Sequence, residues 1–477
     1  MTSVFPEHGR SQEEVLAALA DHRAKDLKSD GHAFAFVYDA GDDARAIARE
    51  AFVASMGANG LDPTAYPSTR KLENGFIATC LELVRAPQGA VGTATAGGTE
   101  SVILAVKAAR DFFRKTRPEI TSPKMLLPET AHACFHKAAA YLGVEIVTVD
   151  VDETFRAKVD DARAKMTKDV ILVVGSAPSY AHGVVDPIPE LAALAKEHGV
   201  LMHVDACVGG WVLPFLRENG IEVPPFDFTV DGVTSLSMDM HKYGFAPKGV
   251  SAVLMRDRAL RDAQYFACAK WSGYSIVNST TLGSKSAAAL GAAVAVLGHL
   301  GRARYRENAK KMWNATEKLC EVVQTTPGLR LLAKPDMNLF AFTTTDGDVF
   351  ELADRMTARG WHVQATYAFG ASPAHIHLTL DPGNSENVDA FAVDLRAAAS
   401  DLPPKQEPPA QVLMLLGQLA KGGEGAAKID SSMLLGALGI VDGQMPSKSA
   451  PIHRLLNAAS PDVREKLLVL FIGELFA

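Results

Sequence analysis

Three short motifs place residues that could do chemistry in a fixed order along the chain. Gly97-Gly98-Thr99-Glu100 opens into apolar residues at helical spacing, so backbone N–H groups and the helix dipole would favour a phosphate there. His203 and Asp205 end an apolar run and, by alternation, would lie on one face of a strand. Lys242 follows a further apolar run. These residue types predict an anion site beside a lysine that could form an imine.

Each motif alone also has an ordinary structural explanation. The glycine run could be a capped turn, Asp205 a hydrogen-bonded core residue, and Lys242 an exposed lysine. Together they favour chemistry, because a buried carboxylate at a strand end needs a cationic partner, such as a protonated pyridine nitrogen. A lysine buried beside a cationic ring loses proton affinity, which suits it to imine formation. The order of phosphate turn, aspartate and lysine resembles that of pyridoxal-phosphate enzymes.

The elements that must position these motifs are strands and helices in alternation. Val170–Val174 predicts a buried strand and Gly175–Val185 a loop. Asp186-Pro187 predicts the N-cap and first residue of a helix, and Val200–Asp205 the next strand. Phe228–Leu236 predicts a further strand. The motifs that follow these strands would then meet at the carboxyl edge of a mainly parallel sheet, where open α/β sheets bind ligands.

The chain divides into four predicted parts. These are a polar helical arm at 1–60 with breaks at Gly41 and Gly57, a large α/β domain at 61–300, a small C-terminal α/β domain at 301–402, and a linker and helical tail at 403–477. In the last two parts we expect helices over Arg302–Gln324, Phe350–Arg359 and Ser460–Phe476, strands near Leu329–Leu332, Leu339–Phe342 and His375–Leu380, and a stiff Pro-rich linker at Leu402–Pro409.

Composition argues against several function classes. A chain of 477 residues exceeds the size of one core, and 48 basic against 55 acidic residues give a net charge of −7 without a long basic block, which argues against nucleic-acid binding. The five cysteines are odd in number and not clustered, which predicts free thiols in a reducing compartment. With neither a secretory signal nor an apolar run long enough for a transmembrane segment, we expect a cytoplasmic enzyme with a small-molecule substrate.

Five segments resemble sphingosine-1-phosphate lyases, which belong with the group II amino-acid decarboxylases. They are GTATAGGTES (92–101), TAHACFHKAA (130–139), GSAPSYAHGVVDPI (175–188), HVDACVGG (203–210) and MDMHKYGFAPKG (238–249). The likeness runs in unbroken order over roughly residues 30–385. It implies the pyridoxal-phosphate-dependent transferase fold of type I, with a mainly parallel seven-stranded sheet in the large domain. It also implies a homodimer that cleaves a phosphorylated sphingoid base into a fatty aldehyde and phosphoethanolamine.

The resemblance also implies a role for individual residues. Lys242 carries pyridoxal 5'-phosphate as a Schiff base, and Asp205 keeps the pyridine nitrogen protonated, so that the ring acts as an electron sink. The other implied cofactor-binding residues are His132 (stacked on the ring), Gly98, Thr99 and His241 (at the phosphate), His203 and Ser279. Lys248 and Tyr38 match catalytic-site residues of the lyases. The base that takes the substrate's hydroxyl proton stays open among Lys248, Lys242 and Tyr38.

Two departures from the lyase pattern concern the substrate. In the segment Asn59–Thr64, Asp62 stands where the lyases have a histidine that helps to receive the substrate's phosphate, and a carboxylate would repel a phosphate. Lys285 stands where they have an arginine, which keeps the charge but loses bidentate recognition.

Three other functions could use some of these residues. An amino-acid decarboxylase would need a cation for the substrate's carboxylate, which Asp62 does not supply. A metal-dependent aldolase or hydrolase could use His203, Asp205, Asp239 and His241, or the pair His375 and His377, but would leave Lys242 and the glycine turn unexplained. A non-enzymatic scaffold would have little need for Lys242 and Asp205.

Overall fold

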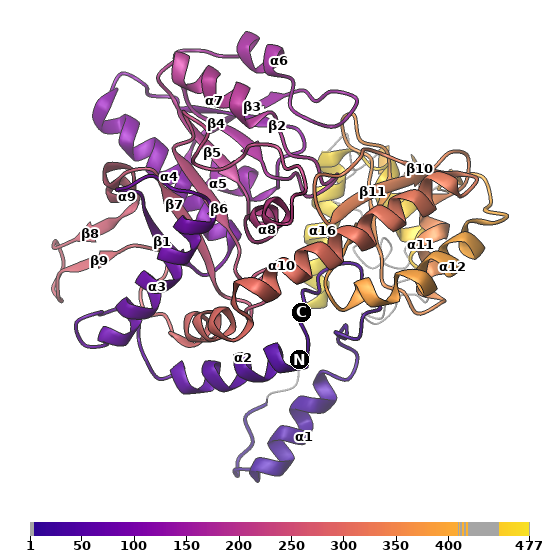
Figure 1. The fold of residues 1–477 in the computed structure, drawn as a ribbon, viewed down its shortest axis with the longest axis horizontal. Helices are drawn as coiled ribbons and strands as arrows, with labels where there is room; N and C mark the ends of the chain where they lie inside the picture. The colour runs from indigo at the N-terminus through magenta and orange to yellow at the C-terminus, as the bar shows by residue number, and fades with distance from the viewer. Residues whose placement is uncertain (1–3, 409, 411–412, 415, 418–447, 477) are drawn as a thin grey trace.

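A large and a small β-sheet lie on either side of one long helix in the computed structural model (Figure 1). The model describes the chain except for residues 1–3, 409, 411–412, 415, 418–447 and 477. The long helix is α10, Ala288–Thr325, which is interrupted at Gly301 with φ 59° and ψ 167°. We predicted only its second half, because the first half is apolar without a clear polar face. Gly301 coincides with the predicted limit of the large domain; the four-part division itself stays a prediction.

The large sheet has seven strands, as predicted, in the order β1-β7-β6-β5-β4-β2-β3. The strands are β1 Val91–Thr95, β2 Lys124–Pro128, β3 Glu145–Val149, β4 Val170–Ser176, β5 Leu201–Asp205, β6 Ser235–Met238 and β7 Ser251–Met255. Only β7 runs antiparallel to its neighbours. The carboxyl ends of β4, β5 and β6 therefore lie side by side, which brings the motifs that follow them together.

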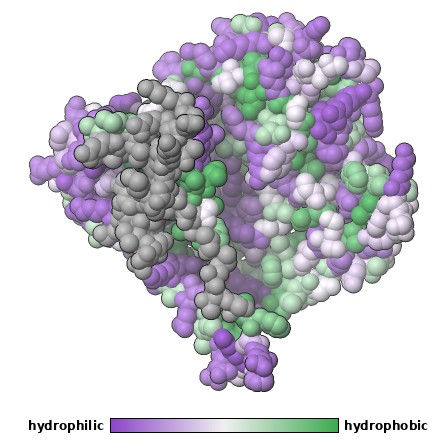
Figure 2. All heavy atoms as spheres, turned by 180° about the vertical axis from the view of Figure 1, so that it is seen from behind, coloured by the Kyte–Doolittle hydropathy of each residue, from purple (hydrophilic) through white to green (hydrophobic). Residues whose placement is uncertain are grey.

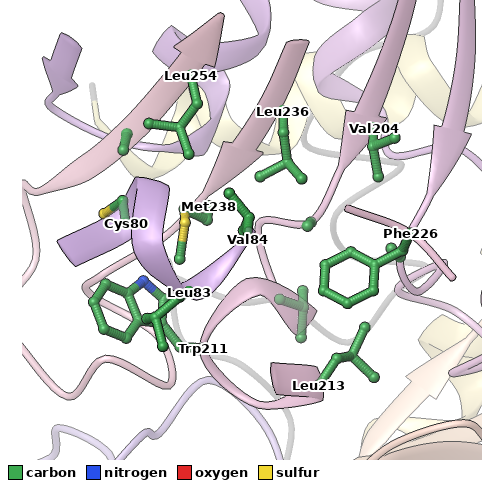
Figure 3. Close-up of a cluster of buried hydrophobic side chains, with 14 of the residues drawn as sticks. Cys80, Leu83, Val84, Val204, Trp211, Leu213, Phe226, Leu236, Met238 and Leu254 are labelled. Carbon is green, nitrogen blue, oxygen red and sulfur yellow. The ribbon is translucent and has the colours of Figure 1, made fainter. Parts of the chain in front are cut away.

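Helices cover both faces of this sheet (Figure 1). They are α3 Pro67–Leu83, α4 Gly98–Thr116, α5 Cys134–Leu142, α6 Val159–Ala164, α7 Ile188–Glu197, η1 Gly209–Trp211, α8 Leu213–Glu218 and α9 Arg258–Gln264. Figure 3 shows Val204 and Leu236 on the face that packs against Trp211 and Phe226. Since strand residues alternate, the neighbours of Val204 in sequence, His203 and Asp205, face the other way together, as predicted.

The small sheet is four-stranded and antiparallel, in the order β10-β11-β13-β12. Its elements are β10 Leu329–Leu331, β11 Leu339–Thr344, α11 Val349–Thr357, β12 Gln364–Thr366, β13 His375–Thr379, η2 Asn384–Asn387 and α12 Val388–Ala399. The predicted strands and the helix near Phe350 are confirmed, but β12 and α12 were not predicted. A two-stranded hairpin, β8 Phe266–Cys268 and β9 Ile276–Asn278, lies apart from both sheets (Figure 1).

The N-terminal segment is tied to the small sheet rather than folded separately. Helix α1, Gln12–His22, projects from the body of the protein, and α2, Asp42–Ser55, packs along α10 (Figure 1). Between them Phe34 is fully buried in the core of the small sheet, and its backbone bonds His362 and Thr379. This pairing places Tyr38 next to Tyr243. The centres of the two rings lie 5.0 Å apart, and the rings are edge-on to each other.

Two local predictions were wrong. Asp186 does not cap α7; its carboxylate accepts hydrogen bonds from the backbone N–H groups of Ser176 and Ala157 and ties a loop to the end of β4. The strand predicted at Phe228–Leu236 begins only at Ser235, because the carboxylate of Asp227 folds the preceding residues into a turn. Apolar composition alone did not separate a buried turn from a strand.

The C-terminal tail has two helices, α15 Ala450–Ala458 and α16 Pro461–Leu475. Helix α15 packs on α11, and Arg464 of α16 lies over the ring of Tyr367. Helix α16 confirms the predicted terminal helix. The carbonyl of Pro403 accepts a hydrogen bond from the backbone of Asp348, and Pro404 forms a β-bridge with Gly347, so the start of the predicted linker packs beside α11. Residue 409, at the end of the predicted linker, lies outside the described residues. No helix in the described part of the chain is long and apolar enough to span a membrane. From behind, hydrophilic and hydrophobic residues alternate over a surface with a recess between two lobes (Figure 2).

Candidate active site

A cavity of about 290 Å³ lies at the carboxyl edge of the large sheet. Six predicted site residues line it, namely Gly98, Thr99, His132, Asp205, His241 and Lys242. Residues that we had not predicted complete the lining, among them Asp239, Ser176 and Tyr180. Residues from four strand ends and from the start of α4 thus converge on one space, which we call the cofactor pocket.

Lys242 is held by a buried carboxylate inside this pocket. Its Nζ lies 2.9 Å from Oδ2 of Asp239, and the side chain of Asp239 is only 1% exposed. Burial lowers the pKa of Lys242, but the charge and hydrogen bond of Asp239, together with Cys207 and Tyr38, outweigh burial and raise that pKa well above the ordinary value. The protein's own side chains therefore do not produce the expected loss of proton affinity. We did not predict Asp239 as the partner of Lys242. Its position three residues before Lys242 was the signal in the sequence that could have indicated this ion pair.

Asp205 is positioned by a short polar chain behind it. Its Oδ1 accepts hydrogen bonds from the backbone N–H of Cys207 at 3.0 Å and from the hydroxyl of Ser237 at 3.4 Å. His203 is fully buried, and its two ring nitrogens contact Ser235 and Ser237. His203 therefore does not line the cofactor pocket and reaches Asp205 only through Ser237.

The opposite end of the pocket fits an anion. Helix α4 begins at Gly98, so its first N–H groups point into the space. His241 Nδ1 is buried there and has no hydrogen-bond partner among the described residues. A phosphate group would satisfy it, because its oxygens accept hydrogen bonds from ring N–H groups. Ser176 Oγ is also buried without a partner, but Ser176 pairs in register with Asp205 and lies at that end of the pocket.

Gly98 is a position where only glycine fits. A Cβ there would lie 2.6 Å from Asp239 Oδ2 and 2.9 Å from Cys207 Sγ. We expect Gly98→Ala to weaken cofactor binding at least about tenfold, because the start of α4 must move away from the pocket. The measurement is an absorption titration of the apoenzyme with cofactor. Gly75→Ala on α3, where an added Cβ meets nothing within 4 Å, is the matched control. Equal affinities of the two variants would contradict the prediction.

His132 lies on the wall of the pocket. Its Nδ1 accepts a hydrogen bond from the backbone N–H of Cys134 at 3.2 Å, and its ring stands edge-on to Tyr180. Burial lowers the pKa of His132, so the ring is favoured in its neutral form. A neutral aromatic ring at this place suits the predicted stacking on a flat cofactor.

Tyr38 and Lys248 form a pair next to the pocket. The Nζ of Lys248 lies 4.8 Å from the centre of the Tyr38 ring and donates a hydrogen bond to the carbonyl of His241 at 3.0 Å. Burial and the nearby charge of Lys242 lower the pKa of Lys248. Burial raises the pKa of Tyr38 far above its ordinary value. Of the two, Lys248 is therefore the group more readily available as a neutral base.

Ser279 lies in a second, larger cavity of about 730 Å³. Arg70, Glu73 and Lys285 also line it, and the backbone carbonyl of Ser279 accepts a hydrogen bond from Gln264. Ser279 is thus not brought to the cofactor pocket within this chain. Asp62 lies near this cavity but uses its carboxylate in a turn, bonding Thr64 and Ala65.

Comparison with known proteins agrees with this geometry. The family model for the conserved domain of pyridoxal-dependent decarboxylases matches residues 4–345. The chain belongs to this family. Its cofactor is pyridoxal phosphate, and the residues of the cofactor pocket fit that group at both ends. A second family model, for a putative C-terminal HTH domain of pyridoxal-dependent enzymes, matches residues 394–474. These residues include the tail, which lies outside the segment that resembles the lyases.

Relatives within the pyridoxal-dependent decarboxylase family include lyases. The sphingosine-1-phosphate lyase of Arabidopsis thaliana is 38% identical over 405 residues, which cover 83% of this chain and 73% of the relative. The structure of the sphingosine-1-phosphate lyase of Burkholderia pseudomallei superposes with a TM-score of 0.80 at 30% identity, over 88% of this chain and 97% of that one. A glutamate decarboxylase of Lactobacillus brevis shares the fold, with a TM-score of 0.74 at 22% identity over 84% and 95% of the two chains. The chain is a pyridoxal-phosphate-dependent lyase.

The alternative metal site gains no support from the described residues. Among them, no group of three or more His, Cys, Asp or Glu side chains could hold a metal ion. The two nitrogens of His203 contact serines and Asp239 pairs with Lys242, so these residues already have partners. His377 contacts the hydroxyl of Thr379 in the same way.

Buried histidines should make this family member sensitive to acid. Burial lowers the pKa of His182 and of His377 to about 3, and that of His203 to about 4. Between pH 6.5 and these values the unfolded chain binds more protons than the folded one, so the free energy of unfolding falls as the pH falls. Urea denaturation at pH 7.5 and pH 5 measures this loss. His377→Gln should show a smaller loss than wild type, whereas the exposed His8→Gln should match wild type. Equal losses in both variants would contradict the assignment.

Proposed function

We propose that this enzyme cleaves a phosphorylated sphingoid base, such as sphingosine 1-phosphate, into a fatty aldehyde and phosphoethanolamine. The names of the relatives above support this choice. The observation that carries it is the position of a second lysine beside the cofactor lysine: the Nζ of Lys248 lies 4.8 Å from the centre of the Tyr38 ring and donates a hydrogen bond to the carbonyl of His241, the residue before Lys242. A lyase of this kind needs a base for the substrate's hydroxyl proton, whereas a decarboxylase needs a cation that stays charged to hold a carboxylate.

The reaction can be followed through the chain's own residues. Bound pyridoxal phosphate supplies an electron sink for the bond that breaks. We infer that Lys242 holds the cofactor covalently and that Asp205 keeps the positive charge of its ring nitrogen. Neutral Lys248 would take the hydroxyl proton of the substrate as the neighbouring carbon–carbon bond breaks and the aldehyde leaves. The amine-bearing carbon would then take up a proton, and phosphoethanolamine would be released. Tyr38, which stays protonated, would hold Lys248 in position by the contact of its ring with the lysine side chain.

The function is tested by measuring the product of each competing reaction: a long-chain aldehyde for the lyase and carbon dioxide for the decarboxylase. Wild-type holoenzyme should release a long-chain aldehyde from sphingosine 1-phosphate. Release of carbon dioxide from an amino acid, without aldehyde from the sphingoid base, would make the enzyme a decarboxylase and overturn the proposal.

Lys248→Arg should lower kcat by roughly 10²–10⁴-fold, because arginine keeps the positive charge but cannot accept a proton at working pH. The cofactor spectrum should be unchanged, since Lys242 is intact. Steady-state kinetics over pH measures this, and Lys310→Arg on the exposed side of α10 is the control. A Lys248→Arg enzyme with wild-type kcat would exclude Lys248 as the base.

We also propose a cytoplasmic homodimer. The five cysteines are free, which suits a reducing compartment. The hairpin of β8 and β9 exposes large apolar residues, including Trp271, Tyr274 and Val277, next to the cavity that holds Ser279. Pairing of two copies over this hairpin would bury those side chains, and Ser279 would then serve the partner's cofactor. Arg70 and Lys285 give the same cavity two cations for a substrate phosphate. A fully active monomer in ultracentrifugation would contradict the dimer.

A further inference from the structure

A third cavity, of about 220 Å³, adjoins the cofactor pocket. The two share His132 and Tyr180 as lining residues, so this outer cavity opens toward the place where the cofactor ring would lie. Its outer wall is the loop Tyr367–Ser372, which contributes Tyr367 and Phe369. Phe369 is 52% exposed, which places an aromatic ring at the mouth of the cavity.

The loop is clamped from both sides. On the side of the large sheet, Glu129 accepts a hydrogen bond from the backbone N–H of Ala371 at 2.9 Å. On the other side, helix α15 of the tail holds it: Asn457 accepts from the backbone N–H of Ala368 at 2.8 Å, and His453 lies 3.0 Å from the hydroxyl of Tyr367. The wall of the outer cavity therefore depends on the C-terminal tail.

Helix α15 is itself firmly anchored to the small sheet. The carboxylate of Asp354 on α11 accepts hydrogen bonds from the backbone N–H groups of Ser449 and Ala450, and Arg454 pairs with the buried Asp348. The ring of Tyr367 also packs into the apolar core of the two tail helices. Because these contacts fix α15 against α11, α15 can set the position of the loop.

The charge of the outer cavity decides which part of a substrate it takes. Among the described residues that line it, Glu129 is acidic and none is a lysine or an arginine, so a phosphate would find repulsion and no counter-charge. Tyr180, Tyr367 and Phe369 offer apolar ring surface instead. The cavity that holds Ser279 also has two glutamates, Glu73 and Glu100, but it offers the cations Arg70 and Lys285, which the outer cavity lacks. The phosphate end therefore suits that cavity better, and the hydrocarbon end suits the outer one.

We propose that α15 is a positioning element of the substrate site: through His453 and Asn457 it fixes the loop Tyr367–Ser372, and the outer cavity takes the hydrocarbon chain of the substrate. This inference rests on the proposed function. His453 and Asn457 are positioning residues, since they act through the loop.

The test is calorimetric binding to the holoenzyme of a long-chain ligand that it cannot cleave, 2-aminooctadecyl phosphate, which lacks the hydroxyl group whose proton the reaction removes. This long-chain ligand is compared with phosphoethanolamine, which has no chain. Asn457→Ala should weaken binding of the long-chain ligand by about fivefold to tenfold, because the loop loses a hydrogen bond. Binding of phosphoethanolamine should change less than about twofold. Asn314→Ala on the exposed face of α10 is the matched control.

A second variant protects the test against simple misfolding of the tail. Ala133→Phe fills the outer cavity without touching α15, and it should weaken binding of the long-chain ligand alone. Equal weakening of both ligands by either variant, or no change in either, would overturn the inference. Failure of the proposed function looks different, because wild type would then release no aldehyde from sphingosine 1-phosphate while chain-dependent binding could still be measured.

Discussion

Lys242→Ala should abolish turnover, lowering activity by roughly 10⁴-fold or more, because the group that holds the cofactor covalently is lost. The visible absorption band of the bound cofactor should disappear with it. This variant also leaves the buried carboxylate of Asp239 without its partner at 2.9 Å. An uncompensated buried charge costs on the order of 3–5 kcal/mol, so we expect a lower melting temperature as well.

Lys242→Arg separates these two effects. Arginine keeps a positive charge beside Asp239, so stability should be largely retained, but it cannot hold the cofactor covalently. Both variants should therefore lack the band, and only the alanine variant should be strongly destabilised. Lys310→Ala on the surface serves as the control for both. A Lys242→Arg enzyme that kept the band and its activity would contradict the assignment of Lys242.

Asp205→Asn should lower kcat by roughly 10²–10³-fold while the protein stays folded. The amide oxygen can still accept from the N–H of Cys207, so the local structure is kept. The negative charge that would stabilise a protonated ring nitrogen is lost, however, and breaking a buried charge pair costs on the order of 3–5 kcal/mol. The measurements are kcat and the cofactor dissociation constant.

The control for this variant is Asp231→Asn, an exposed aspartate that pairs only with Lys196 at the surface. It should leave kcat unchanged. If Asp205→Asn also kept wild-type kcat with a normally bound cofactor, the ring nitrogen would not depend on this carboxylate, and Asp205 would be a structural residue held by Ser237.

The local parts of the site could be predicted from the order and types of the residues. Periodicity and turn residues reflect the backbone nearby. They therefore predicted the turn at Gly98, the strand that ends at Asp205 and the position of Lys242 after a further strand. In a parallel sheet, strand ends meet at one edge, so the topology then brings these motifs together. The class of cofactor followed from their order.

The surroundings of these residues depend on contacts that form only when the chain is folded. The charge state of Lys242 depends on Asp239, and the proximity of Tyr38 to Lys248 depends on Phe34, which ties the N-terminal segment to the small sheet. The tail reaches the outer cavity only because α15 is anchored on α11. Such contacts join segments far apart in the chain, and no local pattern encodes them. They arise from the packing of apolar faces, which leaves each polar side chain the partners that the packing brings within hydrogen-bonding distance.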